Sequence, residues 1–171
     1  MTCLTDECDG VVNSVARSPQ TMTSPSTANK PSAVSRILLP TDFSPTAEAA
    51  LEWGQRMATA FGAKLVLLHV IDLFRSAQLG SPVVAVDPLL PILREEAKRQ
   101  MEQWQTRVQD VETVTLEGAP RPVIVDSAID LRCQMIVMGT HGRSGLAHLL
   151  LGSVAEYVVR HSKVPVLTIH G

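Results

Sequence analysis

The chain of 171 residues has few cysteines and few aromatic residues, and it contains no strongly charged run. Its three cysteines, Cys3, Cys8 and Cys133, are too few and too unevenly spaced for a disulfide framework, and they fit a reducing compartment. No second Cys or His pair complements Cys3 and Cys8 at zinc-site spacing, so we expect no metal site. The net charge of −2 and the pI near 6.2 provide no basic surface for nucleic acid, which we do not expect as a partner.

The sequence also lacks an apolar run long enough to span a membrane. Near its N-terminus it carries Asp6, Glu7 and Asp9, where a signal peptide would be basic and then apolar. We therefore expect a cytoplasmic protein with no membrane partner.

Residues 1–35 contain no aromatic side chain, because all six aromatic residues lie between Phe43 and Tyr157. The segment is rich in Ser and Thr, carries three prolines and has neither helical nor strand periodicity. Such a segment cannot bury enough apolar area to offset the entropy lost on ordering. The sequence therefore predicts a disordered tail over residues 1–35 and one domain over residues 36–171, where the apolar content is sufficient for a core.

Strand and helix patterns alternate through this domain. Five short segments are typical of strands: 37–40, 64–70, 111–116, 135–138 and 166–169. Helices are predicted from Ser44-Pro45 to Gly62, over 89–109, from 120 to about 132, and over 154–161. Alternation of this kind predicts an α/β fold with an open parallel sheet, right-handed crossovers and helices on both faces.

Periodicity also predicts which side chains these elements bury. The first helix is expected to bury Ala50, Trp53, Met57 and Phe61. The second is expected to bury Leu90, Leu93, Ala97, Met101, Trp104 and Val108. His69, inside the second apolar strand, is expected to be a hydrogen-bonded histidine of the sheet rather than a ligand.

The stretch 135–153 contains the strongest functional signal. A short apolar strand runs directly into Gly139 and Gly142, and Gly152-Ser153 then opens an amphipathic segment. Glycines after a strand let the backbone turn with positive φ and let a ligand approach closely, and a helix N-terminus attracts anions. The alternative is that these glycines are ordinary turn residues between a strand and a helix. Two glycine sites at one strand end favour an anion site, most simply for a nucleotide phosphate.

The spacing Gly-x2-Gly-x9-Gly-Ser, together with residues 36–45 and 67–70, resembles the signature of the universal stress protein family in its ATP-binding branch. The resemblance covers residues 35–170. It implies one five-stranded parallel sheet of order 3-2-1-4-5, similar to the adenine nucleotide alpha-hydrolase fold. It also implies ATP as the ligand, alone or with Mg2+ or Mn2+, and a homodimer formed through the C-terminal strand, residues 165–170.

The same resemblance implies roles for individual residues. Pro40, Thr41 and Asp42 match the segment at the adenosine end, and Val70 matches the position beside the adenine. The ribose side is matched by Met138 and Gly139, the phosphate loop by His141, Gly142 and Arg143, and a second phosphate contact by Gly152, Ser153 and Val154. For Asp42, His141 and Arg143 the alternatives are roles within the turns themselves or in solvent.

Two residues depart from the family pattern. Gln134 replaces a common acidic residue before the fourth strand, where it is expected to affect only the start of that strand. Ala155 replaces a residue that often carries a hydroxyl, so one phosphate hydrogen bond is lost, at a net cost of about 0.5–1.5 kcal/mol.

No catalytic residues stand out near the glycines. The sequence lacks the Gly-Lys-Ser/Thr of a P-loop, and it has no carboxylate pair or Ser/His set beside the signature. We therefore expect a nucleotide-dependent regulatory protein of the stress response that acts as a binding or sensor module. The alternatives are a slow ATPase and a structural dimer whose pocket is unused.

Overall fold

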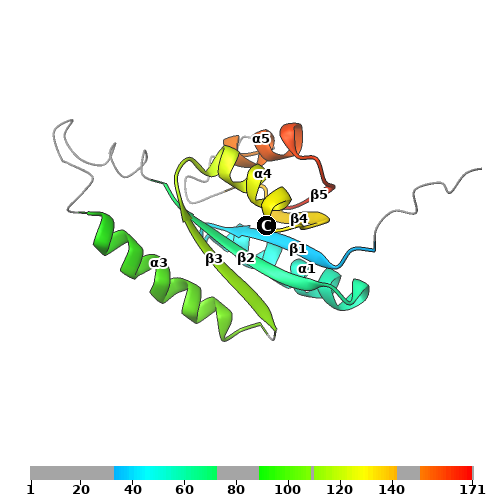
Figure 1. The fold of residues 1–171 in the computed structure, drawn as a ribbon, viewed down its shortest axis with the longest axis horizontal. Helices are drawn as coiled ribbons and strands as arrows, with labels where there is room; N and C mark the ends of the chain where they lie inside the picture. The colour runs from blue at the N-terminus through cyan, green and yellow to red at the C-terminus, as the bar shows by residue number, and fades with distance from the viewer. Residues whose placement is uncertain (1–32, 73–88, 109, 142–150, 171) are drawn as a thin grey trace, which may run out of the picture. The chain divides into compact units, whose positions relative to one another are not determined.

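A computed structural model describes residues 33–72, 89–108, 110–141 and 151–170. Except for residues 33–35, the predicted tail lies outside these ranges. Strands and helices alternate along the described chain (Figure 1). They are β1 (Arg36–Thr41), α1 (Pro45–Phe61), β2 (Lys64–Ile71), α3 (Leu90–Gln105), β3 (Val111–Glu117), α4 (Pro120–Asp130), β4 (Met135–Gly139), α5 (Ser153–His161) and β5 (Val166–Ile169).

The five strands form one sheet in the order β3-β2-β1-β4-β5, and every neighbouring pair is parallel. This confirms the α/β fold and the strand order implied by the resemblance. Helices α1 and α3 cover one face of the sheet, and α4 and α5 cover the other (Figure 1). Successive residues of β1 therefore enter different cores: Ile37 and Leu39 pack with α1 and α3, whereas Leu38 packs on the α4 and α5 side.

The ends of α1 follow the predicted signals. Ser44 is the N-cap, its hydroxyl accepts a hydrogen bond from the Ala47 N–H, and Pro45 begins the helix. Gly62 ends it in the left-handed conformation with φ of 64°, and its N–H donates to the carbonyl of Thr59.

The prediction for the buried face of α1 was wrong for two aromatic residues. Trp53 is 42% exposed and Phe61 is 48% exposed, although Ala50 is fully buried. The centre of the contact is made by small residues, because a Cβ at Gly54 would lie only 2.5 Å from Leu39 Cδ1. A helix that approaches the sheet this closely leaves little room for aromatic rings along its line of contact, which is made by Ala47, Ala50, Leu51 and Gly54.

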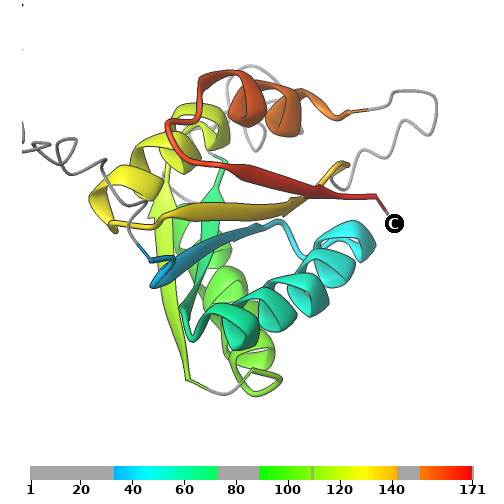
Figure 2. The ribbon, with the colours of Figure 1, turned by 90° about the vertical axis from the view of Figure 1, so that its right-hand side faces the viewer.

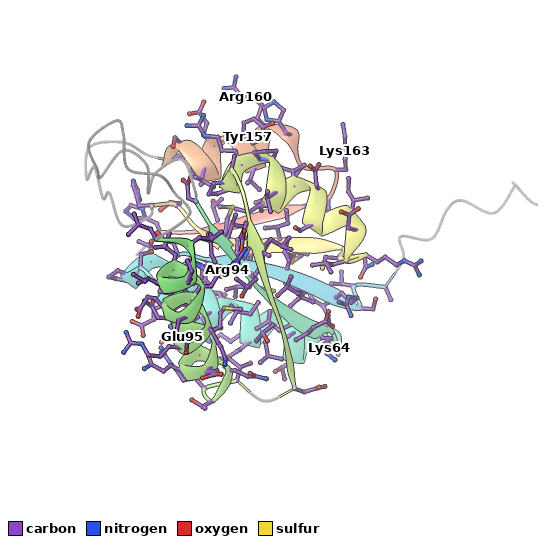
Figure 3. All side chains as sticks on the ribbon, turned by 60° about the vertical axis from the view of Figure 1, so that its left-hand side comes forward. Lys64, Arg94, Glu95, Tyr157, Arg160 and Lys163 are labelled. Atoms are coloured by element: carbon purple, nitrogen blue, oxygen red, sulfur yellow. The ribbon has the colours of Figure 1, made fainter. Side chains whose placement is uncertain are left out.

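The buried stripe of α3 agrees better with the prediction. Ala97, Met101 and Trp104 are buried, and Val108 is buried in the turn that follows, since the helix ends at Gln105 rather than at residue 109. Arg94 and Glu95 lie on α3, on the opposite side of the sheet from Tyr157 and Arg160 of α5 (Figure 3). None of the helices in the described ranges combines the length and the apolarity needed to cross a membrane.

Polar side chains fasten the N-terminal ends of the strands. Arg36 Nη2 lies 3.0 Å from both carboxylate oxygens of Glu112 in β3, and Arg36 Nε donates to the carbonyl of Leu131. Gln134 Oε1 accepts hydrogen bonds from the backbone N–H groups of Ser35 and Arg36. The departure at Gln134 thus acts at the starts of β1 and β4, the edge of the sheet opposite the glycine signature.

Candidate functional site

Strands β1 and β4 separate toward their C-terminal ends. They pair only at Ile37 with Met135 and at Leu38 with Ile136, whereas β1 pairs with β2 along its whole length from Arg36 to Thr41. Beyond the two pairs, β4 remains paired with β5 as far as Gly139. The sheet therefore opens between β1 and β4, where the strand order reverses and ligands of such folds bind.

Pro40 lies where this separation begins. In a parallel ladder, alternate residues direct both backbone polar groups toward the same neighbouring strand. The carbonyl of Arg36 accepts from the N–H of Gln134, on the β4 side, so the backbone groups of Leu38 and Pro40 face β4 as well. Because proline has no N–H, Pro40 cannot continue the ladder with β4.

The loop after β1 is held by its own side chains. Thr41 Oγ1 accepts from the N–H of Phe43 at 3.0 Å, and Asp42 Oδ1 accepts from the N–H of Ser44 at 3.1 Å. Phe43 has a φ of 62°, which is uncommon for a residue other than glycine. For Asp42, one carboxylate oxygen therefore supports the turn, as in the alternative interpretation of this residue.

An aromatic cluster supports the same loop from the α3 side. The ring centroid of Phe43 lies 4.5 Å from that of His69, in a tilted pair, and 5.4 Å from that of Trp104, in an edge-to-face pair. His69 Nδ1 is hydrogen-bonded to the carbonyl of Thr41 at 2.9 Å. His69 is thus a hydrogen-bonded histidine of the sheet, as predicted, and it links the end of β2 to the end of β1.

The first turn of α1 contacts the end of β4. Thr46 Oγ1 donates a hydrogen bond to the carbonyl of His141, and a Cβ at Gly139 would lie 2.9 Å from the backbone carbonyl of Thr46. On the side of α1, the opening between β1 and β4 is therefore filled by the helix itself.

This packing corrects the reason given for two signature glycines. Gly139 does not adopt positive φ, and neither does Gly152, whose φ is −70°. A Cβ at Gly152 would lie 2.9 Å from the carbonyl oxygen of Thr140. At both positions glycine is required because another part of the chain approaches its Cα, and this requirement exists without any ligand.

The N-terminus of α5 lies beside the end of β4. The Gly152 N–H donates to the carbonyl of Thr140 at 2.7 Å, and Gly152, as the N-cap residue, has no side chain to cap the first turn. Ser153 is exposed, and Ala155 is buried. The positive end of the helix dipole is thus positioned at the opening of the sheet.

The structure brings most of the predicted residues to one edge of the sheet. Pro40, Thr41, Asp42, Met138, Gly139, His141, Gly152, Ser153 and Val154 all lie at the C-terminal ends of β1 and β4 or at the start of α5. Val70 is at the end of β2, and it packs against the same apolar core as Met138 and Val154. Gly142 and Arg143 lie outside the described residues.

Three further residues lie in this region without a sequence motif that marks them: Thr46, Thr140 and His170. Thr140 is buried, and its hydroxyl lies 2.9 Å from His141 Nδ1 and 3.2 Å from His170 Nδ1. A buried hydroxyl between two imidazoles has no local sequence signature, because His170 lies thirty positions further along the chain.

Comparison with known proteins identifies the family. The sequence model of the Universal stress protein family matches residues 33–170. This chain belongs to that family. The universal stress protein MJ0577 of Methanocaldococcus jannaschii is 37% identical over 151 residues, which cover 78% of this chain and 93% of that protein.

Solved structures of the family share the fold. The structure of MJ0577 superposes with a TM-score of 0.70 at 36% identity, covering 81% of this chain and 97% of that one. A universal stress protein in complex with cAMP superposes with a TM-score of 0.54 at 29% identity, covering 81% of this chain and 98% of that one.

Proposed function

We propose that this protein binds an adenine nucleotide, with ATP as the natural ligand, alone or with Mg2+ or Mn2+. The observation that carries the proposal is the opening between β1 and β4, which is bordered by the N-terminus of α5, where the N-cap residue Gly152 has no side chain to cap the helix. A related protein of the same fold has been solved with cAMP, which is itself an adenine nucleotide with a phosphate group.

The described residues suit the two ends of such a ligand differently. Val70, Met138 and Val154 supply apolar surface from one core, which suits the adenine and the ribose carbons. The N–H groups in the first turn of α5, which have no partner within the helix itself, suit phosphate oxygens together with the Ser153 hydroxyl. Because the N–H of Gly152 is bonded to Thr140, we assign phosphate contact to Ser153 and Val154 rather than to Gly152. Gly142 and Arg143 complete the proposed phosphate loop.

The proposed role is regulatory: nucleotide occupancy changes the shape or the partners of a cytoplasmic stress protein, with neither nucleic acid nor a membrane as its main partner. Slow ATP hydrolysis is the second candidate. Mass spectrometry of ligand released from freshly purified protein separates the two, because a sensor releases intact ATP or AMP, whereas a hydrolase releases ADP and phosphate.

The substitution Ser153→Asp tests the phosphate end of the site. A carboxylate in the first turn interacts favourably with the positive end of the helix dipole, so the fold should be retained, but the carboxylate repels phosphate. We expect the Kd for ATP, measured by calorimetry, to rise at least tenfold, which corresponds to about 1.4 kcal/mol, while the Kd for adenosine stays unchanged. Ser153→Ala is the matched control, with a small effect on both ligands.

A wild-type protein that binds no ATP would contradict the proposed function. If Ser153→Asp weakened the binding of ATP and of adenosine equally, only the proposed location of the phosphates would be contradicted. Gly142→Val provides a second test, because a side chain in the phosphate loop should abolish binding in a folded protein.

We also propose that the protein is a homodimer joined through residues 165–170. In the described chain β5 pairs with β4 alone, and Figure 2 shows it as the outermost strand on that side of the sheet. Leu167 is only partly buried, and Pro165 removes a donor before the strand begins. A two-fold axis would let the free edge of β5 pair with its copy and close the assembly.

A further inference from the structure

We propose that Thr140 is a positioning residue of this site: it fixes the chain on both sides of the proposed phosphate loop without contacting the nucleotide. The inference rests on the proposed function. Thr140 directly follows β4, and it is only 5% exposed.

The backbone of Thr140 is bonded on two sides. Its N–H donates to the carbonyl of Ile169 in β5 at 2.9 Å, and its carbonyl accepts from the N–H of Gly152 at 2.7 Å. The second bond joins the points where the chain leaves β4 and where it reaches α5. Because Gly152 has no Cβ, the two segments can approach to this distance.

The hydroxyl of Thr140 lies between two imidazoles, 2.9 Å from His141 Nδ1 and 3.2 Å from His170 Nδ1. A hydroxyl has one proton and two lone pairs, so it can donate to at most one of the two imidazoles and must accept an N–H from at least one of them. At least one of these histidines is therefore held with its proton on Nδ1.

The hydroxyl of Thr140 and that of Thr46 act together on His141. The Thr140 hydroxyl orients the imidazole, and the Thr46 hydroxyl holds the carbonyl of His141 from the side of α1. The first residue of the proposed phosphate loop is thus fixed at its ring and at its backbone. His170 extends the same network to the end of β5.

Comparison of Thr140→Val with Thr140→Ser tests this role. Valine keeps the shape and the backbone bonds but loses the hydroxyl, whereas serine keeps the hydroxyl. We expect the Kd for ATP to rise about fivefold or more in Thr140→Val, the change that corresponds to loss of about one net hydrogen bond. Thr140→Ser should stay within about twofold of the wild type, close to the error expected for an unperturbed site.

The imidazole tautomers supply a second readout that needs neither ligand nor variant. Nitrogen NMR of the nucleotide-free wild type should show the Nδ1–H tautomer for at least one of His141 and His170, because the Thr140 hydroxyl must accept an N–H from one of them. In Thr140→Val this tautomer should no longer be held.

Two results would overturn the inference: Nε2–H tautomers for both histidines in the wild type, or unchanged ATP affinity in a folded Thr140→Val. Failure of the wild type to bind ATP would instead count against the proposed function, and the tautomer measurement would still decide the role of Thr140. Should Thr140→Val not fold, the tautomers of the wild type alone decide between the two outcomes.

Discussion

Replacement of Gly139 by alanine separates two explanations for the glycine signature. If the glycine exists to admit a ligand, the nucleotide-free protein should tolerate a methyl group there. The structure argues otherwise, because the added Cβ would lie 2.9 Å from both the carbonyl carbon and the carbonyl oxygen of Thr46, and 3.0 Å from its hydroxyl. Two of these three atoms are backbone, so no rotation of a side chain can relieve the contact.

The cost follows from what must move. To make room, the first turn of α1 has to shift away from β4, although Ala47 and Ala50 of that helix are buried in the core. Forcing one extra carbon into a packed interior costs about 1–3 kcal/mol. For a domain of this size each kcal/mol lowers the melting temperature by about 3 °C, so we expect a fall of roughly 3–9 °C.

The assay is thermal unfolding of protein freed of nucleotide, followed by circular dichroism. Gly62→Ala is the matched control, because a Cβ added at Gly62 would meet open space. Only the left-handed φ of 64° opposes a side chain there, and the strain should lower the free energy of unfolding by about 1 kcal/mol. A Gly139→Ala protein that melts at the wild-type temperature without nucleotide would refute the packing explanation and restore the ligand explanation.

Three further predictions concern other parts of the molecule. Leu167→Pro removes a ladder donor from β5 and should convert the proposed dimer to monomer or aggregate. The interface would be disproved if light scattering showed that the wild type is monomeric at micromolar concentration, or that the variant is still an unaltered dimer. Deletion of residues 1–31 should lower the melting temperature by less than about 5 °C, since the tail has no aromatic anchors, and a larger fall would mean that it packs on the domain. Burial raises the pKa of the Cys133 thiol above its value in the unfolded chain. The contribution of this thiol to the free energy of unfolding is therefore fully present below about pH 8.5, the ordinary pKa of a thiol, and is lost as the pH rises through the pKa of the folded state. Chemical denaturation should show a steeper loss between about pH 8 and pH 10 in the wild type than in Cys133→Ala, and equal slopes would count against this assignment.

The boundaries of α1 were predictable because their signals are local. Ser44, Pro45 and Gly62 each act on the backbone within one turn of their own position, so their effect on α1 does not depend on the rest of the fold. The strand order, in contrast, came from the family resemblance, since periodicity alone identifies strands without ordering them.

The burial of individual residues was less predictable. Helical periodicity indicated the apolar side of α1, but the distance between that helix and the sheet is set by Gly54 against Leu39. A distance of this kind is a property of two elements together. Trp53 therefore lies on a flank, where Arg56 covers its ring at 5.2 Å.

Within the candidate site, the sequence predicted residues that lie near one another in the described ranges, but it did not predict all of their contacts. Gly139 and Gly152 are essential to the local geometry for reasons that involve Thr46 and Thr140. Those partners are distant in sequence or carry no motif, so only the folded structure could reveal them. The ligand contacts themselves remain predictions.

The short ladder between β1 and β4 divides the domain into two groups of strands, β3-β2-β1 and β4-β5, that share few backbone hydrogen bonds. Sub-global opening of a protein tends to follow such a boundary. A nucleotide bound at this boundary would contact both groups and would make their opening more cooperative. Amide hydrogen exchange in β4 and β5 would then report occupancy directly, and in the cell the liganded protein would offer proteases a smaller population of half-open molecules than the free one.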